Sequence, residues 1–278
     1  MITLNSLSGG KTSSYMAAHF PADFDVFAVV CIDDPKCSPK DAGLIQYAND
    51  KFQKFSRNKS EFIATAEDDQ TLRAVRDLEQ LIGREIVWVR SISFDELIAK
   101  RKSVPNIARR FCTSILKIEP IANFVIDHVK EPVLMAQGIR KDEEERQKTG
   151  FDLGYVHGME VIGRNGKPKQ KKVAWAFADY PLIKGGVIHP KVKAWAKESG
   201  LVFPEDSNCV GCFWKDSQQL RKNLDTTPEK MAWFSAMEKA IGGRWKKDIS
   251  YKNISKIGLQ LDFQFGTGAG CKAGFCTD

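Results

Sequence analysis

The fold is decided by the first fourteen residues, MITLNSLSGGKTSS (residues 1–14). Residues 2–7 predict a short apolar strand and residues 12–19 predict a helix, with a glycine-rich turn between them. A strand, such a turn and a helix N-terminus together form an anion site, because glycines allow close approach and the first N–H groups of the helix point at a phosphate. The alternative is a simple turn and helix cap that binds nothing.

Outward from this segment, the chain up to about residue 137 alternates apolar runs with helical patterns. This alternation is typical of βαβ units around a parallel sheet. A capping box with proline at the first helical position is expected at Ser38-Pro39-Lys40-Asp41. The further predicted strands are residues 26–32, 61–64, 85–89 and 132–137, and the further predicted helices are residues 39–55, 71–82 and 114–129.

After residue 138 the pattern changes. Apolar stretches at 159–162 and 173–177 flank an Asn-Gly turn at residues 164–167, which predicts a long hairpin. Residues 215–224 and 228–241 predict a helical pair within a cysteine-bearing C-terminal region. We therefore predict an α/β fold, a Rossmann-like parallel sheet flanked by helices over residues 1–205, with a small cysteine-bearing appendage over residues 206–278.

Composition narrows the class of protein. Of 278 residues, 42% are hydrophobic and 28% are charged, which is ordinary for a globular chain and excludes disordered and fibrous classes. The longest uncharged apolar run has seven residues, whereas a membrane helix needs about 18. The opening residues lack the features of a secretory signal, so we expect a cytoplasmic protein with no membrane partner. The net charge of +7 suits an anionic partner, either a nucleotide or a nucleic acid.

The seven cysteines favour metal or redox chemistry over a disulfide framework, because their number is odd and no export signal precedes them. Cys209 and Cys212, at C-x-x-C spacing, offer two thiolates on one turn. The remaining ligands of a site must come from distant cysteines, since no histidine stands at a metal-pair spacing. The candidates are Cys112, Cys271 and Cys276. Four thiolates suit a [4Fe–4S] cluster or structural zinc equally by composition.

The cysteines at 31 and 37 flank the end of the second predicted strand. For these two cysteines a structural role is favoured over metal or redox chemistry: we expect Cys31 to be a small buried hydrophobic residue and Cys37 to be a thiol in a loop. Asp33 and Asp34 follow the same strand, where a doubly wound sheet places its ligand-binding loops. A solvated turn is the alternative for these two carboxylates.

Several motifs, in this order, resemble the sulfonucleotide (PAPS and APS) reductases of the adenine-nucleotide α-hydrolase-like, or PP-loop, superfamily. Residues 8–13 resemble the SGGxxS pyrophosphate loop. FCTSILKIEP at 111–120 resembles the cysteine, lysine and proline segment of these reductases, and GIRKDEEER at 138–146 is similar to their G-x-R stretch. YPLI at 180–183 and CVGC at 209–212 complete the series, so the resemblance covers about residues 1–215.

The resemblance implies an enzyme that binds an adenine nucleotide (PAPS, APS or ATP) and carries out thiol-dependent or iron–sulfur-dependent sulfur chemistry. It moves the metal assignment from zinc to a [4Fe–4S] cluster. A thiolate of the C-terminal tail, Cys276, would attack sulfur, and a thioredoxin-like thiol donor would release the product. The implied nucleotide-binding residues are Ser8, Gly9, Gly10, Lys11, Thr12, Ser13, Asp33, Lys117 and Arg140, and the implied cluster ligands are Cys112, Cys209, Cys212 and Cys271.

Two positions depart from the pattern of these reductases. Thr12 stands where many members of the superfamily have Asp, and Cys112 is followed by Thr113 where the cluster-bearing reductases have a second cysteine. Because one ligand is missing there, the cysteines of the tail, Cys271 and Cys276, could supply a fourth ligand and a reactive thiol. The sequence leaves open which of the two would be the ligand and which the reactive thiol.

Two other hypotheses compete with the reductase. One is ATP-dependent sulfur transfer to nucleic acid, of the DNA phosphorothioation or tRNA thiolation type, for which the basic hairpin tip would grip the backbone. A solvated charged tip is the plainer interpretation of this cluster. The other hypothesis is a non-catalytic, zinc-stabilised nucleotide-binding protein. The basic residues of the tip are Arg164, Lys167, Lys169, Lys171 and Lys172.

Overall fold

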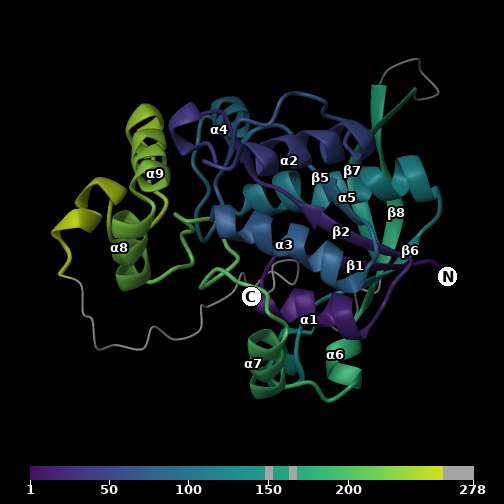
Figure 1. The fold of residues 1–278 in the computed structure, drawn as a ribbon. Coiled ribbons are helices and arrows are strands. Elements are labelled where there is room, and N and C mark those ends of the chain that lie inside the picture. Colours follow the sequence, from purple (N-terminus) through teal and green to yellow (C-terminus); the bar gives the residue numbers. More distant parts are fainter. Residues whose placement is uncertain (148–152, 163–167, 259–278) are drawn as a thin grey trace.

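The protein is an α/β protein built on a six-stranded sheet, of which five neighbouring strands run parallel (Figure 1). The computed structural model describes residues 1–147, 153–162 and 168–258. The strand order is β5-β2-β1-β6-β8-β7, with β7 antiparallel to β8 at one edge. The strands are β1 (Thr3–Leu7), β2 (Phe24–Ala28), β5 (Ile86–Val89), β6 (Val133–Ala136), β7 (Leu153–Ile162) and β8 (Pro168–Asp179).

The order of the parallel strands confirms the predicted α/β class. Numbered along the chain, the five parallel strands stand in the order 3-2-1-4-5, which is the order of a doubly wound sheet. The chain reverses its direction of winding between β1 and β6. In open sheets of this kind, ligands bind outside the carboxyl ends of the strands at this point. The loop after β1 and the loop after β6 therefore meet where a ligand is expected.

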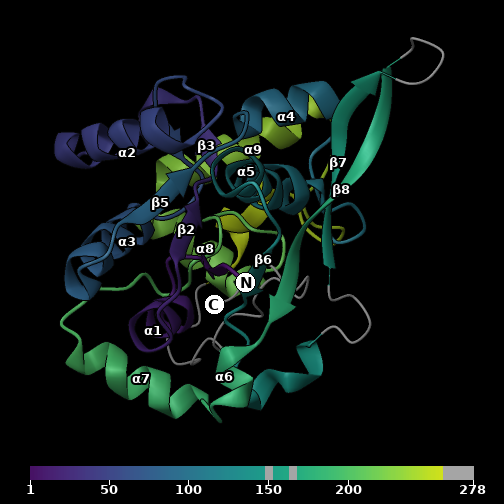
Figure 2. The same ribbon diagram turned by 90° about the vertical axis from the view of Figure 1, so that its right-hand side faces the viewer.

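Helices cover both faces of the sheet (Figure 2). Phe27 and Trp88 point to the face covered by α2 and α3, whereas Val26 and Val87 point to the opposite face, covered by α5. This alternation follows from the two-residue period of a strand. The helices are α1 (Lys11–His19), α2 (Ala42–Phe55), α3 (Asp69–Ile82) and α5 (Glu119–Phe124).

The predicted single strand at residues 26–32 is wrong. β2 ends at Ala28, and β3 (Cys31–Ile32) pairs antiparallel with β4 (Ala64–Thr65) in a separate two-stranded sheet. Between β2 and β3, the carbonyl of Val30 accepts hydrogen bonds from the Ala66 N–H (2.9 Å) and the Thr65 hydroxyl (3.0 Å). These contacts hold the chain against β4 and take it out of the main sheet, which the apolar pattern alone does not reveal.

Two helical predictions need correction. The helix expected at 39–55 begins at Ala42, because Asp41, and not Ser38, caps it by accepting from the Leu44 N–H at 3.1 Å. The helix expected at 114–129 is present, but it is a continuous run in which π-helical turns (Thr113–Ile118 and Val125–Val129) flank α5. The sequence pattern does not predict three further helices, α4 (Phe94–Arg101), α6 (Pro181–Lys184) and α7 (His189–Glu198).

The predicted hairpin is confirmed as an antiparallel pair, β7 and β8, that projects from the body of the molecule (Figure 1). Both strands are longer than predicted, and β8 also pairs with β6, for example Phe177 with Leu134. Of the basic residues of the tip, Arg164 and Lys167 lie outside the described residues, whereas Lys169, Lys171 and Lys172 belong to β8. None of the helices in the described ranges is long and apolar enough to cross a membrane.

The predicted helical pair is present as α8 (Ser217–Thr226) and α9 (Pro228–Ile241). Its side chains share one buried core with β3 and α4, in which Phe234, Trp233 and Trp245 pack around Phe94. Because this core is shared, the C-terminal residues 206–258 are held against the sheet-bearing part of the chain. The assignment of residues 206–278 as a separate appendage stays a prediction.

Candidate nucleotide and thiol site

The glycine-rich turn after β1 has the geometry that its sequence predicts. Gly9 has a φ of +76°, a conformation that side-chain-bearing residues rarely adopt. A Cβ atom at this position would lie 2.4 Å from Cγ2 of Thr71 on α3. Glycine is therefore required twice over, by the left-handed backbone and by the close approach of α3.

Hydrogen bonds from two serines hold the turn in shape. The Ser8 N–H donates to Ser13 Oγ at 3.1 Å, and Ser13 Oγ donates to the carbonyl of Gly10 at 3.1 Å. Helix α1 begins at Lys11 without a side-chain cap at Gly10. The first N–H groups of α1 are consequently not occupied by a capping side chain, as an anion site at a helix N-terminus requires.

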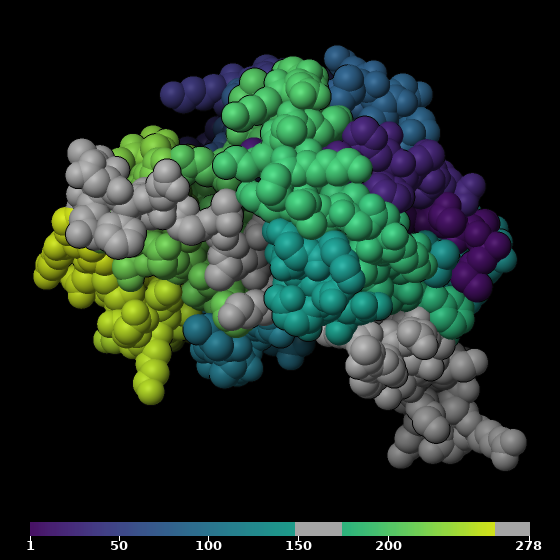
Figure 3. Space-filling view, turned by 90° about the horizontal axis from the view of Figure 1, so that it is seen from below, coloured from purple at the N-terminus to yellow at the C-terminus, as the bar shows by residue number. Residues whose placement is uncertain are grey.

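A pocket opens at the start of α1, and its walls come from four separate parts of the chain. Its volume is about 50 Å³. Figure 3 shows this side of the molecule, with α6 (Pro181–Lys184) and α7 packed beside α1 and the residues after β6. The pocket is lined by Gly10 and the first residues of α1, Lys11 and Thr12, by Arg140, by His189 and Val192 of α7, and by the loop residues Pro204, Glu205, Asp206 and Ser207.

Arg140 aims its guanidinium at the glycine-rich turn. Nη1 donates to the Thr12 hydroxyl at 2.9 Å, while Nε and Nη2 contact Asp142 and Glu143, each at 3.2 Å. The side chain of Arg140 is only 8% exposed, so water screens its charge weakly and the charge interacts strongly with groups in the pocket. Thr12, the position that departs from the SGGxDS pattern, thus serves as the acceptor for Arg140.

His189 lines the same pocket from the N-terminus of α7. Its Nδ1 atom is buried and has no hydrogen-bond partner among the described residues. Burial, and then the positive charge of Arg140, lower the pKa of His189 below its usual 6.5. A bound anion would oppose both effects, because it would favour the protonated imidazolium.

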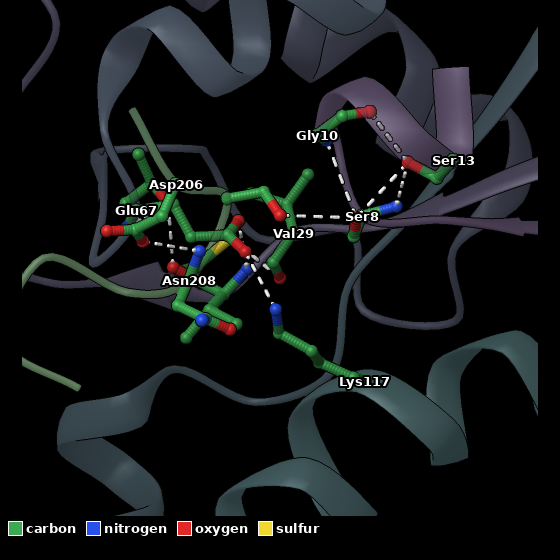
Figure 4. A network of polar contacts seen from close by, with 12 residues as sticks. Ser8, Gly10, Ser13, Val29, Glu67, Lys117, Asp206 and Asn208 are labelled. Atoms are coloured by element: carbon green, nitrogen blue, oxygen red, sulfur yellow. Dashed lines mark hydrogen bonds and ion pairs between the residues drawn. The ribbon is translucent and has the colours of Figure 1, made fainter. Parts of the chain in front are cut away.

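A loop after α7 joins the pocket to the cysteines. Ser207 Oγ donates to Ser8 Oγ at 3.2 Å, and Cys209 follows two residues later. Figure 4 shows Asp206 and Asn208 of this loop on the left, Ser8, Gly10 and Ser13 on the right, and Lys117 below them. Asp206 fixes the loop by accepting from Lys215 and from the Asn208 N–H at 3.1 Å. Sequence reasoning missed Ser207, since an isolated serine before a C-x-x-C carries no signal of its own.

Three of the predicted cluster ligands line one cavity of about 40 Å³, namely Cys112, Cys209 and Cys212. Lys117 lines it too. Burial raises the pKa of the Cys209 thiol well above its usual range, while the charge of Lys117 opposes the rise. The described residues hold no group of three or more His, Cys, Asp or Glu side chains arranged around a single metal ion. The other two predicted thiols, at 271 and 276, lie outside the described residues.

The C-x-x-C turn is built rigidly. A Cβ atom on Gly211 would lie 2.4 Å from the ring of Phe234, so glycine is needed for the ring to pack there. The Val210 N–H donates to the carbonyl of Ala66 at 2.8 Å, and the Tyr251 hydroxyl donates to the carbonyl of Gly211 at 3.0 Å. These contacts fix the backbone between the two thiols from three directions.

Lys117 and Asp33 do not line the pocket at the glycine-rich turn. Lys117 donates to Glu67, a fully buried carboxylate, at 2.9 Å (Figure 4). Asp33 is exposed at the end of β3, where its carboxylate accepts from the Ser93 hydroxyl and its N–H donates to Asp95 at 2.8 Å. Lys117 therefore belongs to the thiol cavity, and the predicted nucleotide contacts of both residues stay predictions.

The remaining cysteines of the described ranges are buried away from both sites. Cys31 and Cys37 are each 2% exposed. Burial raises the pKa of Cys31 to about 12 and that of Cys37 to about 11, so both stay thiols at neutral pH. Cys37 is more buried than the loop thiol that the sequence predicts, because it lies in a 3-10 turn (Pro35–Cys37) within the core shared with α9.

Comparison with known proteins identifies one similar sequence of unknown role. The chain is 35% identical to an uncharacterized protein of Methanocaldococcus jannaschii over 89 residues, which are 32% of this chain and 18% of that protein. The match thus spans about a fifth of the relative's length. No family model matches the chain, and no solved structure matches it.

Proposed function

We propose that this protein is a PP-loop enzyme resembling the sulfonucleotide reductases, which binds an adenine nucleotide at residues 8–13 and performs sulfur chemistry at the neighbouring thiols. The observation that carries the proposal is the hydrogen bond from Ser207 to Ser8, which joins the loop bearing the C-x-x-C to the glycine-rich turn. An adenylate phosphate or sulfate in the first pocket would then lie beside a cavity lined by thiols.

The pocket suits an anion. The N-termini of α1 and α7 both contribute to it, and Arg140 and Lys11 add two cationic side chains. Glu205 and Asp206 also line it, but each is paired with a lysine, Lys222 and Lys215 respectively. Because these two carboxylates are paired, the donors left to an incoming phosphate are the first N–H groups of α1 and the ammonium group of Lys11. Arg140 adds positive charge to the pocket, although Asp142 and Glu143 already contact its guanidinium.

The proposed reaction begins when the thiol of Cys276 loses its proton and its sulfur attacks the sulfate sulfur of the sulfonucleotide. The new S–S bond forms as the bond between that sulfur and the nucleotide oxygen breaks, and the nucleotide leaves with the bonding electron pair. The enzyme is left as a thiosulfonate. An external dithiol of the thioredoxin type then attacks the cysteine sulfur, releases sulfite and restores the thiol with oxidation of the donor to its disulfide.

Cys112, Cys209 and Cys212 would hold a [4Fe–4S] cluster together with Cys271. Three soft donors already line one cavity, and a thiolate ligand set is what such a cluster takes. When bound, the cluster would supply electrostatic and structural support next to the nucleotide. Lys117 lies in the same cavity wall and opposes the loss of thiolate character that burial imposes on Cys209.

Calorimetric titration with PAPS, APS and ATP tests the nucleotide half of the proposal. We expect one of the three to bind the native protein, and the Arg140→Met variant to bind it at least roughly tenfold more weakly, since a charge-assisted contact contributes about 1.5–3 kcal/mol. Arg57→Met is the matched control, because Arg57 pairs with Asp127 in a contact that involves none of the pocket residues. Absence of binding of all three nucleotides to the native protein would refute the proposal.

A second candidate function is ATP-dependent sulfur transfer to nucleic acid. The observation that favours it is the projection of the β7–β8 hairpin, whose second strand begins with the lysine-rich stretch at 168–172 (Figure 2). Turnover of ATP that requires a nucleic acid, and not a sulfonucleotide, would favour this candidate over the first.

A further inference from the structure

A second basic region lies at the opposite end of the molecule from the hairpin. It consists of residues 100–110, which begin in the last turn of α4, and residues 239–256, which begin in the last turn of α9. Figure 1 shows the latter, coloured yellow-green to yellow, beyond α8 and far from β7 and β8. The two segments touch, since a Cβ atom on Gly243 would lie 3.2 Å from Cγ2 of Val104.

The charge of these two segments exceeds that of the whole protein. They carry eleven basic residues and one acidic residue, a net charge of +10, whereas the chain has +7, so all other residues together have −3. Among the described residues, only Lys100 of the eleven forms an ion pair, with Glu96. The exposed basic residues are Lys100, Arg101, Lys102, Arg109, Lys239, Arg244, Lys247, Lys252 and Lys256.

The surface is hollowed and it borders the thiol cavity. A broad depression of about 590 Å³ between α9 and residues 242–252 is lined by Lys239, Arg244 and Lys252. At the other side, the guanidinium of Arg110 lies 5.5 Å from the ring centre of Trp214, which lines the cavity of the three cysteines. Cationic groups thus extend from the depression toward the proposed sulfur chemistry.

The chemistry of this surface fits a polyanion with flat rings. Two arginines lie over aromatic rings, Arg110 on Trp214 and Arg101 on Phe111 at 5.8 Å, and both aromatic rings are partly exposed. Arginine and aromatic planes are the platforms on which unpaired bases stack. Ile107, at 58% exposure, is the one large hydrophobic side chain of the described residues here that is exposed, so the apolar centre of a protein–protein interface is lacking.

We propose that the surface formed by residues 100–110 and 239–256, the basic face, binds single-stranded nucleic acid beside the thiol cavity. This binding goes beyond the proposed adenylate chemistry and does not depend on it. The phosphates follow the exposed lysines and arginines, and bases stack at the arginine and aromatic pairs.

The test is fluorescence anisotropy with a labelled 20-nucleotide oligothymidylate and an oligouridylate of equal length, between 50 and 200 mM salt. If about five phosphates are neutralised, the affinity of the native protein falls roughly 100-fold over this range. A triple variant reverses three charges in the depression: Lys239→Glu, Arg244→Glu and Lys252→Glu. We expect it to bind the oligonucleotide at least roughly tenfold more weakly than the native protein at 50 mM salt. It also lowers the slope of log K against log salt by about 2.

The comparison variant reverses three charges on the hairpin, Lys169→Glu with Lys171→Glu and Lys172→Glu. Binding at the basic face predicts an affinity within roughly threefold of native for this variant, whereas binding at the hairpin, as in the second candidate function, predicts its loss. Unchanged circular dichroism, melting temperature and adenylate binding in both variants separate loss of this surface from loss of fold or of the nucleotide pocket. Failure of the native protein to bind an adenylate refutes the proposed function and leaves the basic face standing.

Three results would overturn the proposal. The first is no oligonucleotide binding, or binding that salt does not weaken. The second is loss of binding in the hairpin variant with retention in the variant of the basic face. The third is displacement of the oligonucleotide by polyglutamate at equal charge concentration, which would assign the surface to an acidic protein.

Discussion

Replacing Gly211 by alanine tests whether the C-x-x-C turn is fixed by the core beneath it. The added Cβ would meet Cδ2 and Cγ of Phe234 at 2.4 Å and Cδ1 at 2.8 Å. The ring is 1% exposed and is held by Trp233 and Trp245, with ring centres 4.9 Å away in each case. Because the ring has no room to withdraw, we expect the upper end of the cost of overpacking, about 3 kcal/mol of the free energy of unfolding.

A double-mutant cycle with Phe234→Leu isolates this contact. The single change at 234 costs about 1.5 kcal/mol through lost packing, and it removes the ring atoms that the new methyl group would meet. The double variant should therefore lose about 2 kcal/mol in all, which is less than the sum of the two single losses by about 2.5 kcal/mol. Urea-induced unfolding, followed by tryptophan fluorescence, measures all four states.

Gly258→Ala is the matched control, since nothing lies within 4 Å of the Cβ position there and its cost should stay within about 0.5 kcal/mol. A loss under about 0.5 kcal/mol for Gly211→Ala would refute the steric argument. Additive losses in the cycle would refute it as well, because they would show that the clash is not with Phe234.

Three further predictions concern the ion pair at the thiol cavity, the histidine of the pocket and the cap of α4. Lys117→Met leaves the buried carboxylate of Glu67 uncompensated and should cost about 3 kcal/mol of stability by urea unfolding, much of which Glu67→Gln restores in the double variant. The pKa of His189 is lower in the folded state than in the unfolded state, so the unfolded state binds the proton more tightly and the free energy of unfolding falls as the pH drops below 6.5. Because glutamine does not titrate, His189→Gln should flatten this decline. Ser93→Ala removes the acceptor of the Glu96 N–H, at 3.1 Å, and should cost about 1 kcal/mol.

Each of these predictions has a contrary outcome. For Lys117, the contrary outcome is that the double variant with Glu67→Gln is as unstable as Lys117→Met alone, which would mean that the lysine stabilises the fold through packing. For His189, it is an unchanged slope below pH 6.5 in the glutamine variant. For Ser93, it is a glycine replacement that costs as much as alanine, since glycine is tolerated at helix N-caps.

The local parts of the fold could be predicted from the sequence. The glycine-rich turn follows a strand and opens a helix within fourteen residues, so its conformation depends on neighbours in the chain. α4 also has a signal in the sequence, Ser93 followed three residues later by Glu96, which is a typical N-cap pattern. Asp41 likewise caps α2, whereas the sequence pattern favours the serine at 38.

The parts that could not be predicted depend on contacts between distant segments. β8 joins the main sheet by pairing with β6, which lies some forty residues earlier in the chain. The sequence pattern of the hairpin does not predict this pairing. The contact of Ser207 with Ser8 joins residues 199 positions apart. The position of Lys117 at the cysteines, away from the nucleotide pocket, results from its pairing with Glu67, which only the folded chain reveals.

The most direct test of the account is the metal content of the protein purified without oxygen, as iron, acid-labile sulfide and zinc per chain. The account predicts about four iron and four sulfide, lost in Cys112→Ala and in Cys209→Ala, because both thiols line one cavity. Cys37→Ala, a buried thiol elsewhere in the core, should keep the native content. Stoichiometric zinc that Cys112→Ala retains would contradict the account and favour a zinc-stabilised nucleotide-binding protein.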